Sequence, residues 1–469
     1  MIPASLQKTA ATSLTRKILE NSVALFTSQL LAKVFRVLAN FLLARFLGPE
    51  NFGSLALVLS FAELFRFLPD FGLDRTLIRR MARGQTAHGV AANLSLRAAL
   101  SSLAVVVMGI TLLFADYPRP VELLMYFYAF SFFLQAGSAT FAAYFQAQLK
   151  SISLVWAYTV SGLLYLGFIL GGIFSAQGLT YFVASLLFAE GSLFLLFGLT
   201  FFKKGGKLVS FNTAELVTMV KEAFPIALYL ALGAAYFRVG TLIVYHYAGE
   251  RGAGLYAACF RLNEAFLMLA ASVAASLFPV FSRLKKEDKA ELSTLFQKSF
   301  FGFLPFTLLL AILISGLSAP IIQFLYGEAY APSAAGLRVI IWSLVFMIAN
   351  TLSTNALVAS DREADITKIT VGNLLVNLSL NFYLVPRFGF IGACWAVLAT
   401  EAVNFTLQTA VLQKILVPKL LGRVWPYFIP PALAVIWYLF YPVSFKSAGI
   451  WLFTFGYLVF LLNRRGGSQ

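Results

Sequence analysis

The sequence predicts an all-α polytopic membrane protein with about 14 transmembrane helices, and three observations support this fold class. Hydrophobic residues make up 60% of the 469 residues and charged residues only 12%, which gives a mean hydropathy of +0.82. A chain of this composition would aggregate in water but suits hydrocarbon. Apolar blocks of helix length, separated by short polar joints, account for nearly everything after Asn21. The third observation is an alternation of positive charge between successive joints.

The first 20 residues are polar and basic, and we expect them to form an uncleaved cytoplasmic tail. The apolar run behind them is longer than a signal-peptide core of roughly 7–15 residues. A bilayer core of roughly 30 Å takes about 20 apolar residues per helix. On this basis the successive blocks predict helices near residues 21–44, 51–69, 90–114, 121–146, 152–175, 179–202, 217–246, 253–280, 299–319, 335–359, 366–386, 389–413, 425–441 and 447–463.

Positive charge indicates which joints face the cytoplasm. If the N-terminus is inside, 24 of the 36 Lys and Arg residues fall on the inner joints or tails and 6 on the outer joints. This split follows the positive-inside rule, so we expect both termini to be cytoplasmic in a multi-pass protein of the cell (inner) membrane. The net charge of +16 then lies mostly beside anionic membrane lipids, and nucleic-acid binding is not needed to explain it.

The chain also contains an internal repeat. At a spacing of 201 residues, Gly48 matches Gly249, Gly53 matches Gly254 and Glu63 matches Glu264. At a spacing of 211 residues, Gly178 matches Gly389 and Glu190 matches Glu401. Two six-helix units that start on the same side of the membrane form a parallel repeat. We therefore predict an N-terminal lobe at 1–210, a C-terminal lobe at 211–420 and two extra helices at 421–469.

Ten charged residues lie inside apolar blocks. The bases are Lys33, Arg36, Arg66, Arg97, Arg238 and Arg261, and the acids are Glu63, Glu190, Glu264 and Glu401. A charge at the bilayer centre costs about 2.5–3.5 kcal/mol even on the lenient scale, so such residues normally have partners or face a wet cavity. The spacing of three residues predicts a Glu63–Arg66 pair and an Arg261–Glu264 pair. The alternative is that these groups only clamp or pack helices.

The surplus of bases over acids favours an anionic ligand, because Arg forks and Lys point charges hold phosphate groups well in a low-dielectric cavity. We expect Lys33, Arg36 and Arg238 to bind substrate, supported by Arg66 and Arg261. Glu63 and Glu264 are predicted to act in gating or ion coupling, together with Glu190 and Glu401. Arg97 lies near a cytoplasmic helix end, where its side chain is expected to reach the interface.

One predicted helix carries a polar stripe. Asn373, Asn377 and Asn381 recur at steps of four residues and so share one helical face. Sugar hydroxyls would suit these amides, and Asn373 and Asn377 are therefore predicted substrate contacts. Hydrogen bonding between helices explains such a stripe equally well.

Several activities find no support in the sequence. The two histidines, His88 and His246, lie far apart, so we predict no metal site and no catalytic residues. Cys259 and Cys394 both fall in apolar blocks, which gives a disulfide framework no support. The segment 203–207, KKGGK, lacks the spacing and the Ser or Thr of a phosphate-binding loop. We expect no cofactor, and a proton or sodium gradient rather than ATP as the energy source.

Six patches of sequence, in this order, resemble the polysaccharide transporter family, which includes O-antigen-type flippases and belongs to the superfamily of multidrug exporters. They are ARFLGPENFGSLAL with DFGL at 70–73, FPIAL at 224–228, GLYAACFRLNEAF, LFPVFSRL, FLYGEAYAPSAAGLRVI and NFYLVPRFGFIGACWAVLATE. The resemblance implies two six-helix lobes facing a central cavity and transport by alternating access. Many relatives carry an aspartate shortly after the arginine equivalent to Arg238, where this chain has Gly240, so that aspartate's role in ion coupling is not carried over.

The resemblance and the charges together predict a non-enzymatic flippase for a polyprenyl diphosphate-linked oligosaccharide. Its partners would be the lipid-linked glycan, membrane lipids and other polysaccharide-assembly proteins. One alternative is an ion-coupled exporter of drugs or other small molecules. A membrane-embedded glycan polymerase or ligase is another, but such enzymes are expected to carry a long external loop, and every external joint here is short.

Overall fold

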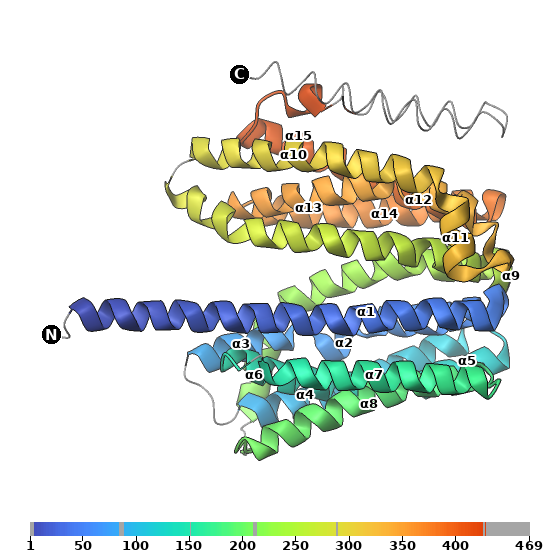
Figure 1. Ribbon diagram of the computed structural model, residues 1–469, viewed down its shortest axis with the longest axis horizontal. Coiled ribbons are helices and arrows are strands. Elements are labelled where there is room, and N and C mark those ends of the chain that lie inside the picture. The colour runs from blue at the N-terminus through green and yellow to red at the C-terminus, as the bar shows by residue number, and fades with distance from the viewer. Residues whose placement is uncertain are drawn as a thin grey trace. The chain divides into compact units, whose positions relative to one another are not determined.

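The computed structural model describes residues 4–83, 89–150, 152–209, 213–287, 289–424 and 427, and every regular element in these ranges is helical (Figure 1). The predicted all-α fold class is therefore confirmed. The elements are α1 (Ala4–Phe65), α2 (Phe67–Asp70), α3 (Leu73–Ala82), α4 (Gly89–Leu113), α5 (Arg119–Ala129), α6 (Ser131–Ala147), α7 (Ile152–Phe174), α8 (Leu179–Lys203), α9 (Thr213–Glu287), α10 (Lys289–Gly316), α11 (Ser318–Tyr326), η1 (Glu328–Tyr330), α12 (Ser333–Ile340), α13 (Ser343–Ala359), α14 (Glu363–Phe388) and α15 (Phe390–Ile415).

Nine helical stretches within these ranges are long and apolar enough to cross a membrane. In this number each of the two long kinked stretches, Val34–Ala82 and Glu215–Leu267, is counted once. The helices α4, α7, α8, α14 and α15 lie within a few residues of their predicted ranges. The predicted helices at 425–441 and 447–463 lie outside the described residues apart from Tyr427, so the predicted total of 14 stays a prediction.

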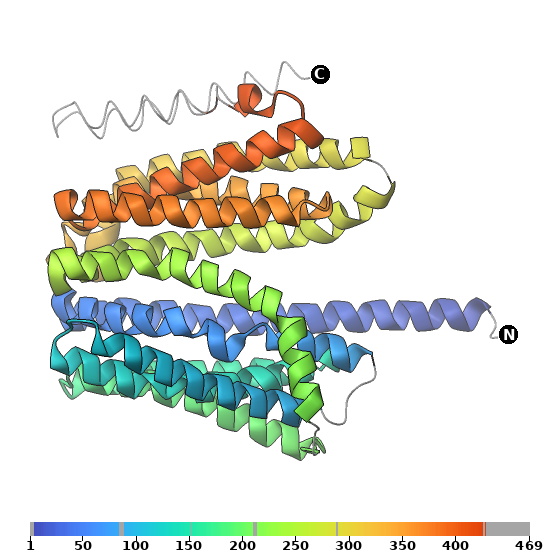
Figure 2. The ribbon, with the colours of Figure 1, turned by 180° about the vertical axis from the view of Figure 1, so that it is seen from behind.

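The chain forms two compact units. The first contains Met1–Leu47 and Ser54–Val239, and the second contains Gly48–Gly53 and Gly240–Gln469. The start of α9, residues 213–239, thus belongs to the first unit, whereas the lobe boundary predicted after residue 210 stays a prediction. In the first unit α7 and α8 lie side by side (Figures 1 and 2), and α8 also packs on α6.

Two glycines break the two longest helices at equivalent places. Gly48 interrupts α1 with φ 70° and ψ 170°, and Gly249 interrupts α9 with φ 67° and ψ −171°. A positive φ is readily adopted only by glycine. Because the two breaks are 201 residues apart and share one backbone conformation, they support the predicted repeat.

The segments after these breaks meet in a reciprocal contact within the second unit. A Cβ atom on Gly53 would collide with the backbone oxygen of Glu250, and a Cβ atom on Gly254 would collide with the backbone oxygen of Pro49. An ion pair joins Arg251 to Glu50 at 3.2 Å beside this contact. Glycine is therefore needed at both positions for two backbones to approach this closely.

The first unit has an elbow that interrupts the chain between α2 and α3. Phe71 has φ 45° and Gly72 has φ 72°, so two consecutive residues are left-handed. No helix was predicted between residues 69 and 90, but Leu73–Ala82 forms the helix α3. In the second repeat α9 continues as helix from Gly249 to Glu287 without such an elbow.

Candidate functional site

A long-range ion pair connects the first and last membrane helices of the first repeat. Nη2 of Arg36 in α1 lies 2.7 Å from Oε1 of Glu190 in α8. The Arg36 side chain is 51% accessible, whereas that of Glu190 is only 11% accessible. The arginine therefore remains reachable while the carboxylate lies behind it. Sequence spacing gave no sign of this pair, because the two residues are 154 positions apart.

The predicted Glu63–Arg66 pair is present, and it lies at the C-terminal end of α1. Nη1 of Arg66 lies 2.7 Å from Oε1 of Glu63, at the junction where α1 ends and α2 begins. The three-residue spacing places both groups on one face, as expected for a helix. Both side chains remain partly accessible.

These two pairs and Arg238 form the charged cluster of the first unit. Arg36 interacts electrostatically with Arg66 as well as with Glu190, and Glu63 with both Arg36 and Arg238. Three guanidinium groups against two carboxylates leave one net positive charge inside apolar helices. A cluster of this kind can exchange a carboxylate partner for an incoming anion.

For two of the predicted substrate contacts, Lys33 and Arg261, the structure gives no ion-pair partner within the described residues. Lys33 lies one turn before Arg36 in α1, but its side chain is outside the described residues. In the second unit, Nε of Arg261 is buried and lacks a hydrogen-bond partner within the described ranges. Glu264 is half-buried and has interaction partners of its own. The Arg261–Glu264 pair stays a prediction.

The acid that matches Glu190 in the second unit has a different partner. Glu401 in α15 is buried and accepts a hydrogen bond of 2.8 Å from Nδ2 of Asn350 in α13. The same amide also donates to the backbone oxygen of Glu401 at 3.2 Å. Equivalent positions of the repeat thus hold an ion pair in one unit and an amide–carboxylate pair in the other.

The asparagine stripe of α14 is buried in the second unit. Nδ2 of Asn381 donates to Oδ1 of Asn377 at 3.1 Å, and Nδ2 of Asn377 donates to Oγ1 of Thr400 at 3.3 Å. Bonding between helices therefore accounts for Asn377. The Oδ1 atoms of Asn373 and Asn381 are buried and have no hydrogen-bond partner in the part of the chain that the structure describes.

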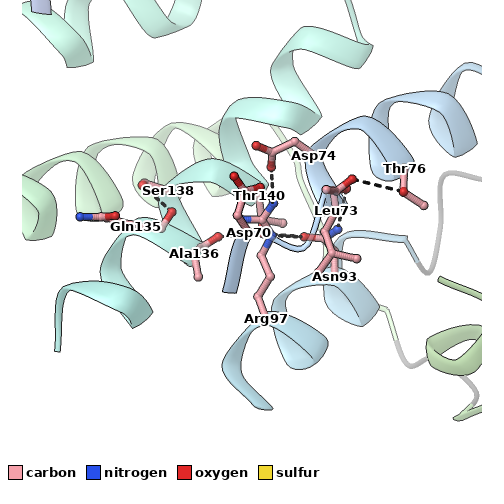
Figure 3. Close-up of polar contacts among 11 residues, drawn as sticks. Asp70, Leu73, Asp74, Thr76, Asn93, Arg97, Gln135, Ala136, Ser138 and Thr140 are labelled. Carbon is pink, nitrogen blue, oxygen red and sulfur yellow. Dashed lines mark hydrogen bonds and ion pairs between the residues drawn. The ribbon is translucent and has the colours of Figure 1, made fainter. Parts of the chain in front are cut away.

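Arg97 is buried within the protein at the elbow of the first unit, and its expected reach to the membrane interface stays a prediction. Its accessible fraction is 2%, and its guanidinium contacts Asp74 and lies 3.9 Å from Asp70 (Figure 3). Nε of Arg97 donates to Oδ1 of Asn93 at 3.0 Å. A basic side chain this deep needs paired charges, which the two aspartates supply. The sequence signal that would have found this network is DFGLD together with an Asn and an Arg four residues apart.

The helix α3, which follows the elbow, also forms ion pairs with the start of α9. Nε of Arg80 lies 3.1 Å from Oε2 of Glu222, and Nη2 of Arg79 lies 3.5 Å from the same atom. Phe71 packs on Phe224 beside this carboxylate, with ring centroids 6.4 Å apart. We call Arg79, Arg80 and Glu222 the strap.

Among the described residues, no three His, Cys, Asp or Glu side chains are grouped so that they could hold a metal ion. His88 lies outside these residues. Cys259 and Cys394 are buried free thiols.

Family models match most of this fold. A model described as "Polysaccharide biosynthesis protein" matches residues 18–285, and one described as "MatE" matches residues 225–383. The first match covers more than half of the chain.

Two curated relatives match shorter stretches. The chain is 31% identical over 155 residues to "Uncharacterized membrane protein MJ1068" of Methanocaldococcus jannaschii, covering 33% of this chain and 31% of that protein. It is 26% identical over 186 residues to "Probable flippase AglR" of Haloferax volcanii, covering 38% of each. The matches thus span about a third of the length of these relatives.

Solved structures share the fold at low sequence identity. An inward-facing multidrug resistance MATE family transporter of the MOP superfamily has a TM-score of 0.68 at 14% identity, covering 82% of this chain and 95% of that one. The lipid II flippase MurJ, in an inward closed conformation, has a TM-score of 0.71 at 13% identity, covering 94% and 98%. The fold and the family match agree: the chain is a multi-pass membrane protein that belongs to the family described as "Polysaccharide biosynthesis protein".

Proposed function

We propose that the protein is a secondary transporter that flips a polyprenyl diphosphate-linked oligosaccharide from the cytoplasmic to the outer leaflet for cell-surface polysaccharide synthesis. The observation that carries this proposal is the charged cluster, in which Arg36, Arg66 and Arg238 outnumber Glu63 and Glu190 within apolar helices. An excess of guanidinium groups at membrane depth selects for an anion, because phosphate oxygens accept two hydrogen bonds from one Arg fork.

The two ion pairs allow the substrate to bind by exchange, in which its diphosphate replaces the carboxylates as the partner of the arginines. Arg36 is neutralised by Glu190 and Arg66 by Glu63. A diphosphate that enters from the accessible side of Arg36 replaces these carboxylates as the partner of the guanidinium groups. The cost of leaving two carboxylates without partners in an apolar setting then favours their protonation or their pairing with a cation.

This exchange links substrate binding to an ion gradient. A ligand shifts a conformational equilibrium only by its different affinity for the two states. If the carboxylates are protonated only when the diphosphate occupies the arginines, a proton gradient biases the direction of flipping, and a sodium gradient acts in the same way. Glu264 and Glu401 are the corresponding acids proposed for the second unit.

The glycan would contact polar groups of the second unit. Asn373 and Asn377 are the proposed contacts of the sugar hydroxyls, and their buried amides would meet the glycan in a conformation that opens this face of α14. Lys33 and Arg261 add positive charge for the diphosphate. Relatives support this class of substrate by their names, since one is a probable flippase and a structure with the same fold is a lipid II flippase.

The proposed setting is the cell (inner) membrane with both termini cytoplasmic. Other polysaccharide-assembly proteins would supply the lipid-linked glycan at the inner leaflet and consume it at the outer leaflet. No nucleic acid and no catalytic residue enters this scheme.

The proposal is tested in vesicles that contain a fluorescent polyprenyl diphosphate-linked sugar. The rate at which an external quencher reaches the label measures flipping. Arg36→Gln and Arg66→Gln should each slow flipping at least about tenfold, because each removes a charge-assisted contact worth about 1.5–3 kcal/mol. Arg119→Gln is the matched control, since Arg119 forms a pair with Glu122 of the same three-residue spacing at 2.8 Å but is highly exposed. Equal rates in all three variants would refute the role of the cluster.

Export of a small molecule is the second candidate, favoured by the MatE match at residues 225–383. A cationic substrate would meet the net positive charge of the cluster, so this candidate requires a neutral or anionic compound. Accumulation of cationic dyes in cells with and without the protein separates the two: a drop in accumulation that requires Glu63 and Glu190 would favour export.

A further inference from the structure

The elbow between α2 and α3 is the most unusual backbone feature of the first unit. Phe71 is left-handed at φ 45° although it carries a bulky side chain, and Gly72 follows at φ 72°. A left-handed residue other than glycine is strained, so contacts elsewhere must hold it. A Cβ atom on Gly72 would also collide with Ile226. The elbow is therefore a shape that the surroundings impose.

Arg97 spans this elbow from α4. Its guanidinium contacts Asp74, which follows the elbow, and lies 3.9 Å from Asp70, which precedes it (Figure 3). The two carboxylates are about 40% accessible, whereas the arginine is 2% accessible. One terminal nitrogen of the guanidinium fork, Nη2, thus faces the carboxylates on both sides of the elbow, while Nε is held by Asn93.

The fork itself is held by its neighbours. Asn93, one turn earlier in α4, accepts a hydrogen bond from Nε of Arg97 at 3.0 Å and another from Oγ1 of Thr140 in α6 at 2.8 Å. Nδ2 of the same asparagine donates to the backbone oxygen of Leu73 at 3.2 Å. All of these groups are buried, and a buried network with satisfied partners is rigid.

A short path of bonds joins the elbow to the charged cluster. The backbone N–H of Asp70 donates to the oxygen of Arg66 at 3.2 Å, and the N–H of Arg66 donates to the oxygen of Glu63 at 3.3 Å. The Arg66 side chain then pairs with Glu63. A displacement of Asp70 moves the backbone that carries both members of this pair.

We propose that Arg97 is a positioning residue for the transport site: by clamping Asp70 and Asp74 across the elbow, it sets the place of the Arg66–Glu63 pair that receives the diphosphate. This inference rests on the proposed function and adds to it a residue that touches no substrate. The second repeat has no elbow, so the role belongs to the first unit alone.

The test is a double-mutant cycle on binding. The probe is geranylgeranyl diphosphate, added to the full chain in lipid nanodiscs, with geranylgeraniol as the control lipid that lacks the diphosphate. Arg97→Gln should weaken binding of the diphosphate about tenfold, and Arg66→Gln should weaken it by a similar factor. Because Arg97 acts through Arg66, the double variant should lose no more than about twofold beyond Arg66→Gln alone.

A clamp that only stabilises the fold gives a different result. Losses of affinity would then multiply in the double variant, and this outcome would overturn the proposal. Binding of Arg97→Gln within about twofold of the unaltered protein would overturn it as well. If the unaltered protein does not prefer the diphosphate over the alcohol, the proposed function fails, and the positioning role fails with it.

Arg97→Lys keeps the measurement informative if Arg97→Gln does not fold. Lysine retains the charge that balances the two aspartates but lacks the Nε–H that donates to Asn93, so its amine is not held between the carboxylates as the fork is. We expect Arg97→Lys to fold and to bind the diphosphate several-fold more weakly than the unaltered protein. Combined with Arg66→Gln, it should again cause little further loss of affinity. Full affinity in Arg97→Lys would overturn the need for the fork.

Discussion

Nη2 of Arg36 and Oε1 of Glu190 lie 2.7 Å apart and come from the first and the last membrane helix of the first repeat. The pair therefore ties the two ends of that repeat together at the site where the anion is proposed to bind. Its two members differ in exposure, so the substrate meets the arginine first.

Glu190→Gln should tighten binding of geranylgeranyl diphosphate and slow flipping. The amide keeps the shape of the side chain but no longer competes for Arg36 as a charge, so we expect an affinity gain of up to about tenfold. Slower release then lowers the flipping rate. Affinity in nanodiscs and quencher access in vesicles measure the two effects, and weaker binding in this variant would contradict the exchange chemistry.

Glu222→Gln should loosen the strap that holds the start of α9. The ion pairs of Glu222 with Arg79 and Arg80 are partly exposed, so their loss is worth about 1 kcal/mol at most and should raise the open population by up to about fivefold. The readout is the rate at which a maleimide labels Cys introduced at the buried Ala223 in a chain without its natural cysteines.

Glu215→Gln is the control for the strap, because Glu215 lies two turns earlier in α9 and forms no ion pair among the described residues. High salt should mimic Glu222→Gln by screening the same pairs. Unchanged labelling in Glu222→Gln would show that apolar contacts alone hold this segment.

Gly53→Ala and Gly254→Ala should each lower the apparent melting temperature of the purified protein. The added methyl group collides with backbone rather than with a movable side chain, and overpacking of this kind costs about 1–3 kcal/mol. Gly302→Ala is the control, because nothing lies within 4 Å of the added atom. Alanine is a better helix former, so this control should be neutral or slightly stabilising. Equal melting temperatures in the three variants would argue against the close backbone contact.

Asn373→Ala should separate glycan recognition from diphosphate recognition. Loss of one hydrogen bond, worth about 0.5–1.5 kcal/mol, should weaken a sugar-bearing polyprenyl diphosphate by up to about tenfold. Binding of geranylgeranyl diphosphate, which has no sugar, should stay unchanged. If both ligands lose affinity equally, Asn373 does not recognise the glycan.

Periodicity and charge predicted much of this molecule because the membrane enforces both. A helix must span a fixed thickness and satisfy its own backbone, so α4, α7 and α8 could be placed from composition alone. The Glu63–Arg66 pair could also be predicted, since three residues along a helix bring two side chains together.

Contacts between distant parts of the chain could not be predicted in the same way. No local rule connects Arg36 to Glu190, and the burial of Arg97 depends on how α4 packs against the elbow. The α3 helix was missed because its many charges mask a short amphipathic pattern. These features arise from tertiary packing, which local sequence patterns do not encode.

The reciprocal contact of Gly53 with Glu250 and of Gly254 with Pro49 has the form of a subunit interface. Each half contributes the same two positions of the repeat, as two identical chains do across a twofold axis. An ancestral six-helix chain could have made this contact with a second copy of itself. The neighbouring pair of Glu50 with Arg251 could not have existed then, because these are also equivalent positions and two identical chains would have placed like charges there. In one chain the two equivalent positions are free to differ, and here they carry opposite charges that hold the two segments together.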